Sequence, residues 1–183
     1  MPLTRPVYLT GFMGSGKSTI GPKLATALGV AFIDLDHEIV RRAGKSIPEI
    51  FTAEGENAFR ALERTVLGEI PHREPAVVSV GGGALVDAEN LRSALESGTV
   101  VYLKASAKTL AARLTRGAAG RPMLRGESGE TLQGDALRRR IETLLEGRRP
   151  YYERAHVIVE TSDRNVADLV AEIADRVTRR DQA

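Results

Sequence analysis

The residues with the clearest chemical meaning lie near the start of the chain, where a glycine-rich stretch ends in a lysine and a hydroxyl. Residues 11–19 read GFMGSGKST and fit G-x-x-x-x-G-K-[ST] at every fixed position. Glycines let successive N–H groups point at phosphate oxygens, and the positive end of a following helix adds to that field. We expect a purine nucleoside triphosphate here, with Lys17 on its β- and γ-phosphates and Ser18 on Mg²⁺. The neighbouring nucleotide-binding residues are then Gly14, Ser15, Gly16 and Thr19.

Two carboxylates follow the second apolar run, in the sequence FIDLD at residues 32–36. The carboxyl ends of strands line the ligand crevice of a parallel α/β sheet, and alternation in an extended segment puts Asp34 and Asp36 on the same side. Asp34 can hold Mg²⁺, and Asp36 can orient an acceptor hydroxyl and take its proton. The alternative that Asp36 only caps the helix starting at His37 stays open.

A third feature is Arg60, which lies off the apolar face of its predicted helix. Glu56 and Glu63 stand at the i−4 and i+3 positions from it. Such spacing is common in exposed ion pairs, which contribute about 0.2–0.5 kcal/mol. The functional alternative is that Glu63 holds Arg60 ready to bind the carboxylate of a substrate in bidentate geometry.

A second glycine run follows the third apolar stretch, in the sequence SVGGGALV at residues 79–86. It has no lysine after its glycines, so it is a poor second phosphate loop. We interpret Gly81, Gly82 and Gly83 as a backbone floor that donates N–H groups to a compact polar acceptor. A plain turn between a strand and a helix remains the alternative.

The elements that must position these residues alternate between strand and helix patterns. This alternation predicts a three-layer α/β/α fold, with a five-stranded parallel sheet and helices on both faces. The form of a capping box at Ser46 and the apolar spacing from Glu56 to Ile70 predict further helices. Strands are expected at 7–10, 31–34, 76–80, 99–103 and 157–160, the first helix at 17–28, and the last over 166–177.

Length and composition limit the remaining choices. The 183 residues fit one domain, and the absence of cysteine excludes disulfides and thiolate metal sites. The formal net charge is +2, aromatic residues make up 4% and tryptophan is absent, which disfavours a nucleic-acid partner. No apolar run has the length of a membrane helix. We therefore expect a cytoplasmic monomer that binds small molecules.

Taken together, six stretches resemble the shikimate kinase family, over nearly the whole length from Val7 to about Arg164. These stretches are GFMGSGKST, FIDLD, ENAFRALE, SVGGGALV, RPML and RRPYYERA. The resemblance implies a P-loop kinase that transfers the γ-phosphoryl group of MgATP to the 3-hydroxyl of shikimate. A related gluconate kinase, and a binding protein that has lost catalysis, are the alternatives.

The resemblance also implies roles for single residues. Asp34 would support Mg²⁺, Asp36 would contact shikimate as the base, and Gly82 would give it a backbone contact. Arg60 and Arg148 would bind its carboxylate. Among the remaining arginines, Arg121 would close on the ATP phosphates as a catalytic residue, and Arg116 and Arg164 would flank the adenine.

The segment 117–134, GAAGRPMLRGESGETLQG, is rich in glycine and polar residues. A loop of this length inside a compact domain is uncommon and is often a lid over an active site. We expect a mobile lid here and a shikimate-binding helical region at about 36–64. A disordered surface insertion is the alternative for the first of these segments.

Overall fold

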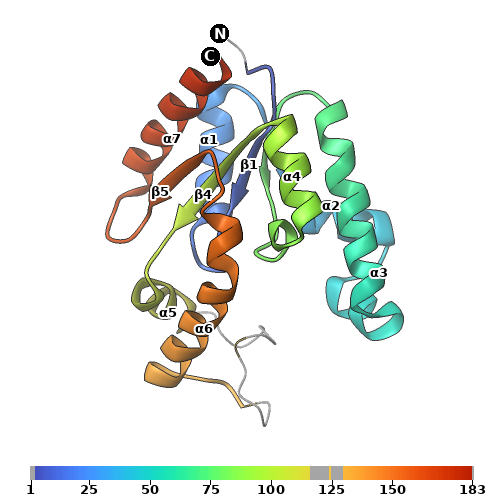
Figure 1. Ribbon diagram of the computed structural model, residues 1–183, viewed down its shortest axis with the longest axis vertical. Coiled ribbons are helices and arrows are strands. Elements are labelled where there is room, and N and C mark those ends of the chain that lie inside the picture. Colours follow the sequence, from blue (N-terminus) through green and yellow to red (C-terminus); the bar gives the residue numbers. More distant parts are fainter. Residues whose placement is uncertain (1–2, 116–123, 125–129, 183) are drawn as a thin grey trace.

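The computed structural model describes residues 3–115, 124 and 130–182. Strands and helices alternate along these residues, as the sequence predicts (Figure 1). The strands are β1 (Val7–Thr10), β2 (Ala31–Asp34), β3 (Ala76–Ser79), β4 (Thr99–Lys104) and β5 (Val157–Glu160). The helices are α1 (Lys17–Leu28), α2 (Leu35–Ala43), α3 (Ile47–Glu69), α4 (Ala88–Ser97), α5 (Ala107–Thr115), α6 (Gly134–Tyr152) and α7 (Val166–Asp181), with short 3₁₀ turns η1 (Ile70–His72) and η2 (Ala84–Val86).

The five strands form one sheet in the order β2-β3-β1-β4-β5, and every neighbouring pair is parallel. The central strand β1 therefore has β3 on one side and β4 on the other. Parallel strands place all their carboxyl ends at one edge, so the segments after β1, β2 and β3 meet there. These segments are the three stretches that the sequence marks for chemistry.

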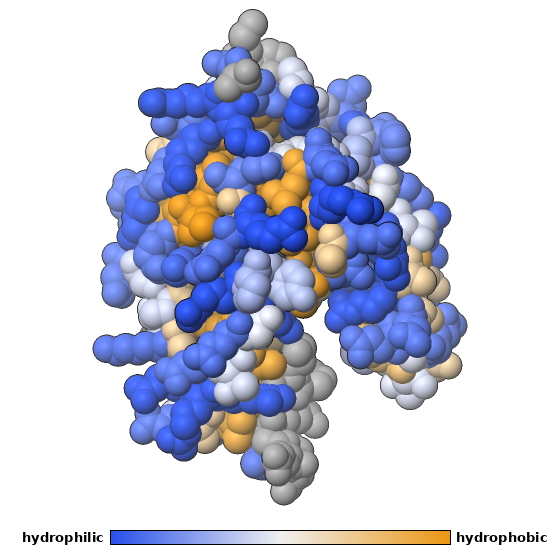
Figure 2. Space-filling view, in the orientation of Figure 1, coloured by the Kyte–Doolittle hydropathy of each residue, from blue (hydrophilic) through white to orange (hydrophobic). Residues whose placement is uncertain are grey.

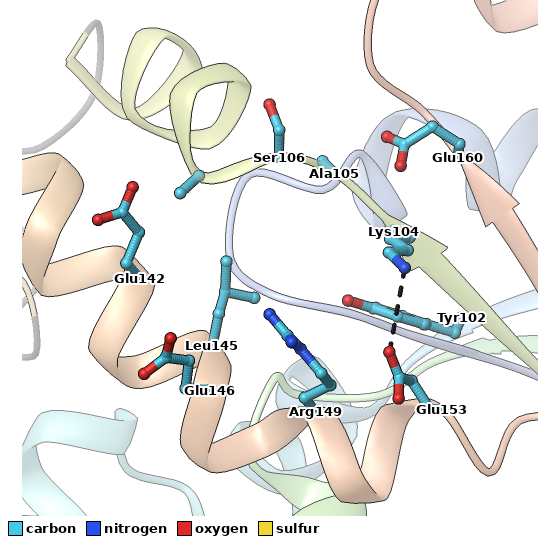
Figure 3. Close-up of a pocket in the computed structure, with 11 residues that line it drawn as sticks. Tyr102, Lys104, Ala105, Ser106, Glu142, Leu145, Glu146, Arg149, Glu153 and Glu160 are labelled. Atoms are coloured by element: carbon cyan, nitrogen blue, oxygen red, sulfur yellow. Dashed lines mark ion pairs between the residues drawn. The ribbon is translucent and has the colours of Figure 1, made fainter.

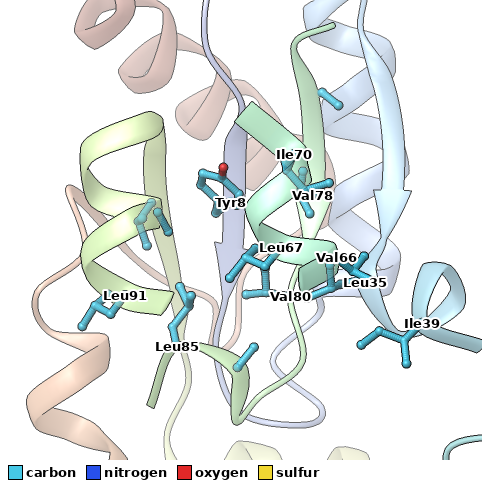
Figure 4. Close-up of a cluster of buried hydrophobic side chains, with 14 of the residues drawn as sticks. Tyr8, Leu35, Ile39, Val66, Leu67, Ile70, Val78, Val80, Leu85 and Leu91 are labelled. Carbon is cyan, nitrogen blue, oxygen red and sulfur yellow. The ribbon is translucent and has the colours of Figure 1, made fainter. Parts of the chain in front are cut away.

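Two apolar cores cover the two faces of the sheet. On one face, α1 and α7 pack against side chains such as Leu9, Val77 and Val101. On the other face, α2, α3 and α4 pack around Tyr8 and Val78, and Figure 4 shows these side chains pointing toward the same interior space. The predicted three layers, with a five-stranded parallel sheet and helices on both faces, are confirmed.

A third apolar cluster lies beyond the carboxyl edge of the sheet. Phe12, from the phosphate loop, packs there with side chains of α5 and α6 and with Leu124, which is 2% exposed. Because Phe12 is 1% exposed, the loop is anchored by a buried aromatic side chain within its own sequence. This cluster fixes α5 and α6 relative to the glycines of the loop.

The expected strand boundaries agree with the structure to within one residue, and α7 continues four residues beyond the predicted Val177. The helix 17–28 matches α1, and the capping box forms, because Ser46 accepts a bond from the Glu49 N–H while the Glu49 carboxylate accepts one from Ser46. Within α3, Gly55 has φ 83° and ψ 174°, so two helical segments meet at a kink. In the described part of the chain, no helix is long and apolar enough to span a bilayer.

Candidate active site

A cavity of about 540 Å³ opens at the carboxyl edge of the sheet. Figure 2 shows the surface notched between the side that carries α6 and the side that carries α3. Three predicted motifs contribute to the walls of the cavity: the phosphate loop, the Asp34–Asp36 segment and the second glycine run. The lining residues are Met13, Gly14, Gly16, Lys17, Ser18, Thr19, Ile20, Asp34, Asp36, Ser79, Val80, Gly81, Gly82, Arg113 and Val166.

The phosphate loop has a backbone that only glycine adopts easily. Gly11, Gly14 and Gly16 have φ of 145°, 80° and 108°, values that L side chains rarely take. A Cβ on Gly11 would also lie 2.7 Å from the carbonyl oxygen of Leu103 in β4. The helix α1 begins at Lys17, so its free N–H groups and positive end face the cavity. The Lys17 Nζ donates to the Gly11 carbonyl oxygen at 2.7 Å, within this loop.

Asp34 starts the helix α2 and also lines the cavity. One of its oxygens, Oδ1, accepts hydrogen bonds from the N–H groups of Asp36 at 3.0 Å and His37 at 3.3 Å. The capping residue is therefore Asp34, and the alternative that Asp36 caps the helix is wrong. Asp36 lies in the first turn of α2, so the helical turn, rather than strand alternation, brings both carboxylates to the cavity.

The donor set beside the phosphate loop fits Mg²⁺. The Ser18 hydroxyl and the Asp34 carboxylate are hard oxygen ligands lining the same cavity, and Mg²⁺ in nucleotide sites commonly takes one or two protein oxygens plus phosphate oxygens. Residues 3–115, 124 and 130–182 contain no cluster of three or more His, Cys, Asp or Glu side chains suited to a metal. The site therefore suits a metal held together with a nucleotide.

Asp36 lies in an environment that favours its neutral form. Burial raises the pKa of its carboxyl group, and the negative charge of Asp34 raises it further, against the opposing influence of Lys17, His37 and Arg60. Its Oδ1 lies 3.2 Å from the position that a Cβ on Gly81 would take. A carboxylate with a raised pKa is a better proton acceptor, and this one lies against the second glycine run.

Arg60 projects from α3 toward the second glycine run. Its Nη1 donates to Glu63 at 2.8 Å, and its Nη2 donates to Glu56 at 3.2 Å. Glu63 is 1% exposed, whereas an ordinary surface pair has two solvated partners. The Arg60 Nη2 lies 3.3 Å from where a Cβ on Gly83 would stand. The buried glutamate thus holds the guanidinium against the glycine.

Two side chains of α6 bind the middle glycine. The carbonyl oxygen of Gly82 accepts hydrogen bonds from Arg148 Nη1, at 3.1 Å, and from the Tyr152 hydroxyl. The Gly81 and Gly83 carbonyls accept bonds from the N–H groups of Ala84 and Val86 in η2. The three carbonyl oxygens are thus all engaged within the protein. The role of the run as a backbone floor for an acceptor stays a prediction.

Some predicted residues do not line the cavity. These include Ser15, Gly83, Arg60 and Arg148, although Arg60 and Arg148 lie against the second glycine run. Arg164 donates to Glu172 of α7 at 2.6 Å and does not line the cavity, so its place beside adenine stays a prediction. Arg116 and Arg121 lie outside the described residues, as does most of the expected lid at 117–134. Their roles also stay predictions.

Sequence reasoning missed Arg113 of α5. Its Nη1 donates to the Gly14 carbonyl at 3.2 Å, and its Nη2 donates to the Thr161 carbonyl at 2.8 Å. It therefore joins the phosphate loop to the segment after β5. No local pattern separates it from the other arginines of this stretch, because both of its partners are distant in sequence. Tyr152 was also missed, although the motif RRPYYERA contains it.

The fold and this cavity define a P-loop kinase, with a nucleotide end at residues 11–19 and an acceptor end at the second glycine run. The family model for shikimate kinase matches residues 13–178. A shikimate kinase of Salinibacter ruber is 47% identical over 97% of this chain and 86% of its own length, and one of Chlorobium phaeobacteroides is 45% identical over 94% and 86%. The chain belongs to the shikimate kinase family.

Solved structures agree with this assignment. Shikimate kinase from Acinetobacter baumannii in complex with shikimate superimposes with a TM-score of 0.83 and 37% identity, covering 96% of this chain and 94% of that one. A gluconokinase from Sinorhizobium meliloti gives a TM-score of 0.64 at 21% identity, covering 100% and 96%. The second likeness shows the shared fold alone, so the sequence relatives favour shikimate kinase over the gluconate kinase alternative.

Proposed function

We propose that this chain transfers the γ-phosphoryl group of MgATP to the 3-hydroxyl of shikimate. The observation that carries the proposal is the convergence of three charged side chains on one glycine run beside a phosphate loop. Asp36, Arg148 and Arg60 lie 3.2, 3.3 and 3.3 Å from the Cβ positions of Gly81, Gly82 and Gly83, respectively. A proton acceptor and two guanidinium groups then surround a compact acceptor that carries a hydroxyl and a carboxylate.

The nucleotide end is served by the loop and the first turn of α1. The glycine N–H groups and Lys17 bind the phosphates, and Lys17 exchanges its bond to the Gly11 carbonyl for bonds to phosphate oxygens. Ser18 and Asp34 would hold Mg²⁺, which when bound would neutralise negative charge that develops on the phosphates. Gly14, Ser15, Gly16 and Thr19 complete the nucleotide contacts.

The acceptor end is served by Asp36, Arg60 and Arg148. Both guanidinium groups can bind a carboxylate, and the buried Glu63 keeps Arg60 in place before the substrate arrives. Asp36 accepts the proton of the attacking hydroxyl, and burial of its carboxyl supports this role. Phosphoryl transfer then depends chiefly on alignment and on compensation of negative charge.

The proposal extends to residues outside the cavity. On the strength of the family resemblance, we assign Arg121 to the ATP phosphates as a catalytic residue and Arg116 and Arg164 to the adenine. The segment 117–134 would then act as a lid that excludes water. The cysteine-free composition is compatible with a cytoplasmic enzyme, and we further propose that the enzyme acts as a monomer.

A coupled ADP-release assay tests the proposed reaction directly. Purified chain with MgATP should turn over when shikimate is added and should stay at the background rate with gluconate. Asp36→Asn, which keeps the shape of the side chain and removes its basicity, should lose the shikimate-dependent rate while ATP binding is retained. Turnover stimulated by gluconate alone, or no turnover despite ATP binding, would contradict the proposal.

A further inference from the structure

A second cavity, of about 250 Å³, lies on the other side of α6 from the acceptor end. Figure 3 shows it between the carboxyl end of β4, the start of α5, the outer side of α6 and the end of β5. It shares no lining residue with the nucleotide cavity among the described residues. Its walls are formed by Tyr102, Lys104, Ala105, Ser106, Ala107, Glu142, Leu145, Glu146, Arg149, Glu153 and Glu160.

One wall of this cavity carries a tyrosine hydroxyl that makes no hydrogen bond to another described residue. Tyr102 is 5% exposed, and its ring stacks on Tyr152 with centroids 4.9 Å apart. Its hydroxyl has no hydrogen-bond partner in the described part of the chain, and Figure 3 shows it directed into the cavity. Burial raises the pKa of Tyr102 to about 12, so the hydroxyl remains a donor at neutral pH. A donor on a largely buried ring that faces a cavity in this way is suited to an acceptor oxygen on a ligand.

The charged residues that line the cavity are two cations, Lys104 and Arg149, and the four glutamates Glu142, Glu146, Glu153 and Glu160. Lys104 lies 4.0 Å from Glu153, whereas Arg149 points into the same space as the Tyr102 hydroxyl and has no ion-pair partner within the described ranges. Glu142 and Glu146 stand nearer the start of α6, where Glu142 also pairs with Arg138 at 3.6 Å, and Leu145 between them is directed inward. The cavity therefore offers one cation without an ion-pair partner, a short apolar wall and a largely acidic lining.

We propose that this cavity binds a small zwitterion, a molecule of amino-acid size with one carboxylate and one ammonium group. The carboxylate lies between the Tyr102 hydroxyl and Arg149, the apolar body lies on Leu145, and the ammonium faces Glu146 and Glu142. A phosphate or other dianion would be repelled by the acidic lining. A simple amine would leave the Tyr102 donor and Arg149 without a partner.

The two cavities share no lining residue among the described residues, although α6 carries both and Tyr102 stacks on Tyr152, whose hydroxyl donates to Gly82. Arg148 donates to the Gly82 carbonyl at the acceptor end, whereas its neighbour Arg149 lines the second cavity. Neither Tyr102 nor Arg149 lines the nucleotide cavity. Substitutions of these two residues can therefore be tested for binding with shikimate-dependent turnover as a check on folding.

The first probe is L-leucine, titrated into ¹⁵N-labelled protein, with the amide signals of Lys104 and Ser106 as the readout. Two matched probes each lack one charge: 4-methylpentanoate keeps the carboxylate, and 3-methylbutylamine keeps the ammonium. We expect saturable shifts with L-leucine and at least fivefold weaker binding of each single-charge probe. Tyr102→Phe should weaken L-leucine binding about fivefold, typical of one hydrogen bond, and Arg149→Gln about tenfold or more.

Two control variants separate the site from general effects. Tyr8→Phe removes a buried hydroxyl that bonds to Ser97, and Arg179→Gln removes an exposed arginine that pairs with Asp175. Both should bind L-leucine as the parent does. The proposal is overturned if L-leucine gives no saturable shift, if Tyr102→Phe and Arg149→Gln leave its affinity unchanged, or if the amine binds as tightly as L-leucine.

Discussion

The two glycine-rich segments of the site use glycine for different physical reasons. In the phosphate loop, Gly11, Gly14 and Gly16 take positive φ values, so the backbone itself forms the binding surface. In the second run, none of the glycines Gly81–Gly83 has a positive φ. There, the absent side chains make room for charged groups that arrive from three different helices. A conformational requirement can be read from a local motif, whereas a requirement for space depends on distant parts of the chain.

Lys17→Ala should give the largest loss of activity, because it removes the cation that stands beside the backbone N–H groups of the phosphate loop. We expect kcat to fall about 10²–10³-fold, the loss typical of one charge-stabilising donor. Far-UV circular dichroism should match the parent, because Lys17 is only partly buried and alanine is the best helix former. A variant with the parent kcat would show that the backbone alone supports phosphoryl transfer.

Arg60→Ala tests the second glycine run, where charged side chains rather than the backbone are proposed to bind the substrate. We expect KM for shikimate to rise about 10- to 100-fold, because charge-assisted hydrogen bonds contribute roughly 1.5–3 kcal/mol, while KM for ATP stays unchanged. The substitution also leaves Glu63 buried without its cation, so the free energy of unfolding should fall. Steady-state kinetics with each substrate varied in turn measure the difference. Equal changes in both KM values would instead point to a structural Arg60.

A matched pair of glycine substitutions tests the contrast itself. Gly14→Ala forces alanine to φ 80° and places its Cβ 3.1 Å from Leu114, so we expect a loss of about 1–2 kcal/mol in unfolding free energy and a higher KM for ATP. Gly83→Ala keeps an ordinary backbone and meets only the movable end of Arg60. It should leave stability within about 0.5 kcal/mol and raise KM for shikimate a few-fold. Chemical denaturation measures the stability of both variants, and steady-state kinetics measure their KM values. If both variants changed stability and KM in the same way, the two runs would not differ in why they need glycine.

The smallest effect is expected at His156, which lies away from both segments. Its Nδ1 accepts a hydrogen bond from the Val100 N–H at 3.2 Å, so the ring is unprotonated on that atom. Burial, and then the charge of Arg180, lowers the pKa of His156 below its usual 6.5. His156 therefore binds a proton more readily in the unfolded chain than in the folded one. The contribution of neutral His156 to the free energy of unfolding is complete above pH 6.5 and declines as pH falls through the folded pKa. Denaturation at several pH values should show a gentler decline in His156→Gln, with both KM values unchanged.

The helices, strands and motif residues were predictable because each depends on residues that are close together in the sequence. The run Val7–Thr10 and the helix starting at Lys17 follow from β-branched residues, glycines and helical spacing. The bond from Arg113 to the Gly14 carbonyl joins residues 99 positions apart, and that from Tyr152 to Gly82 spans 70. Only the packing of α5 and α6 brings these atoms together. The sequence predicts a helix start at Ser46 and helical spacing from Glu56, in agreement with the two segments of α3. The positive φ of Gly55 between them was not predicted, because a single glycine does not show which φ it takes.

The arrangement of α7 has a consequence for behaviour at high concentration. The strand β5 forms one edge of the sheet, and Ile158 on it is 36% exposed. Arg176 of α7 donates to the Ile158 carbonyl oxygen at 2.8 Å, which occupies an edge acceptor with a charged side chain. An open edge strand is a template on which another chain can add, and a charge placed on it discourages that pairing. The helix α7, which completes one apolar core, therefore also disfavours the pairing of β5 with a strand of another molecule.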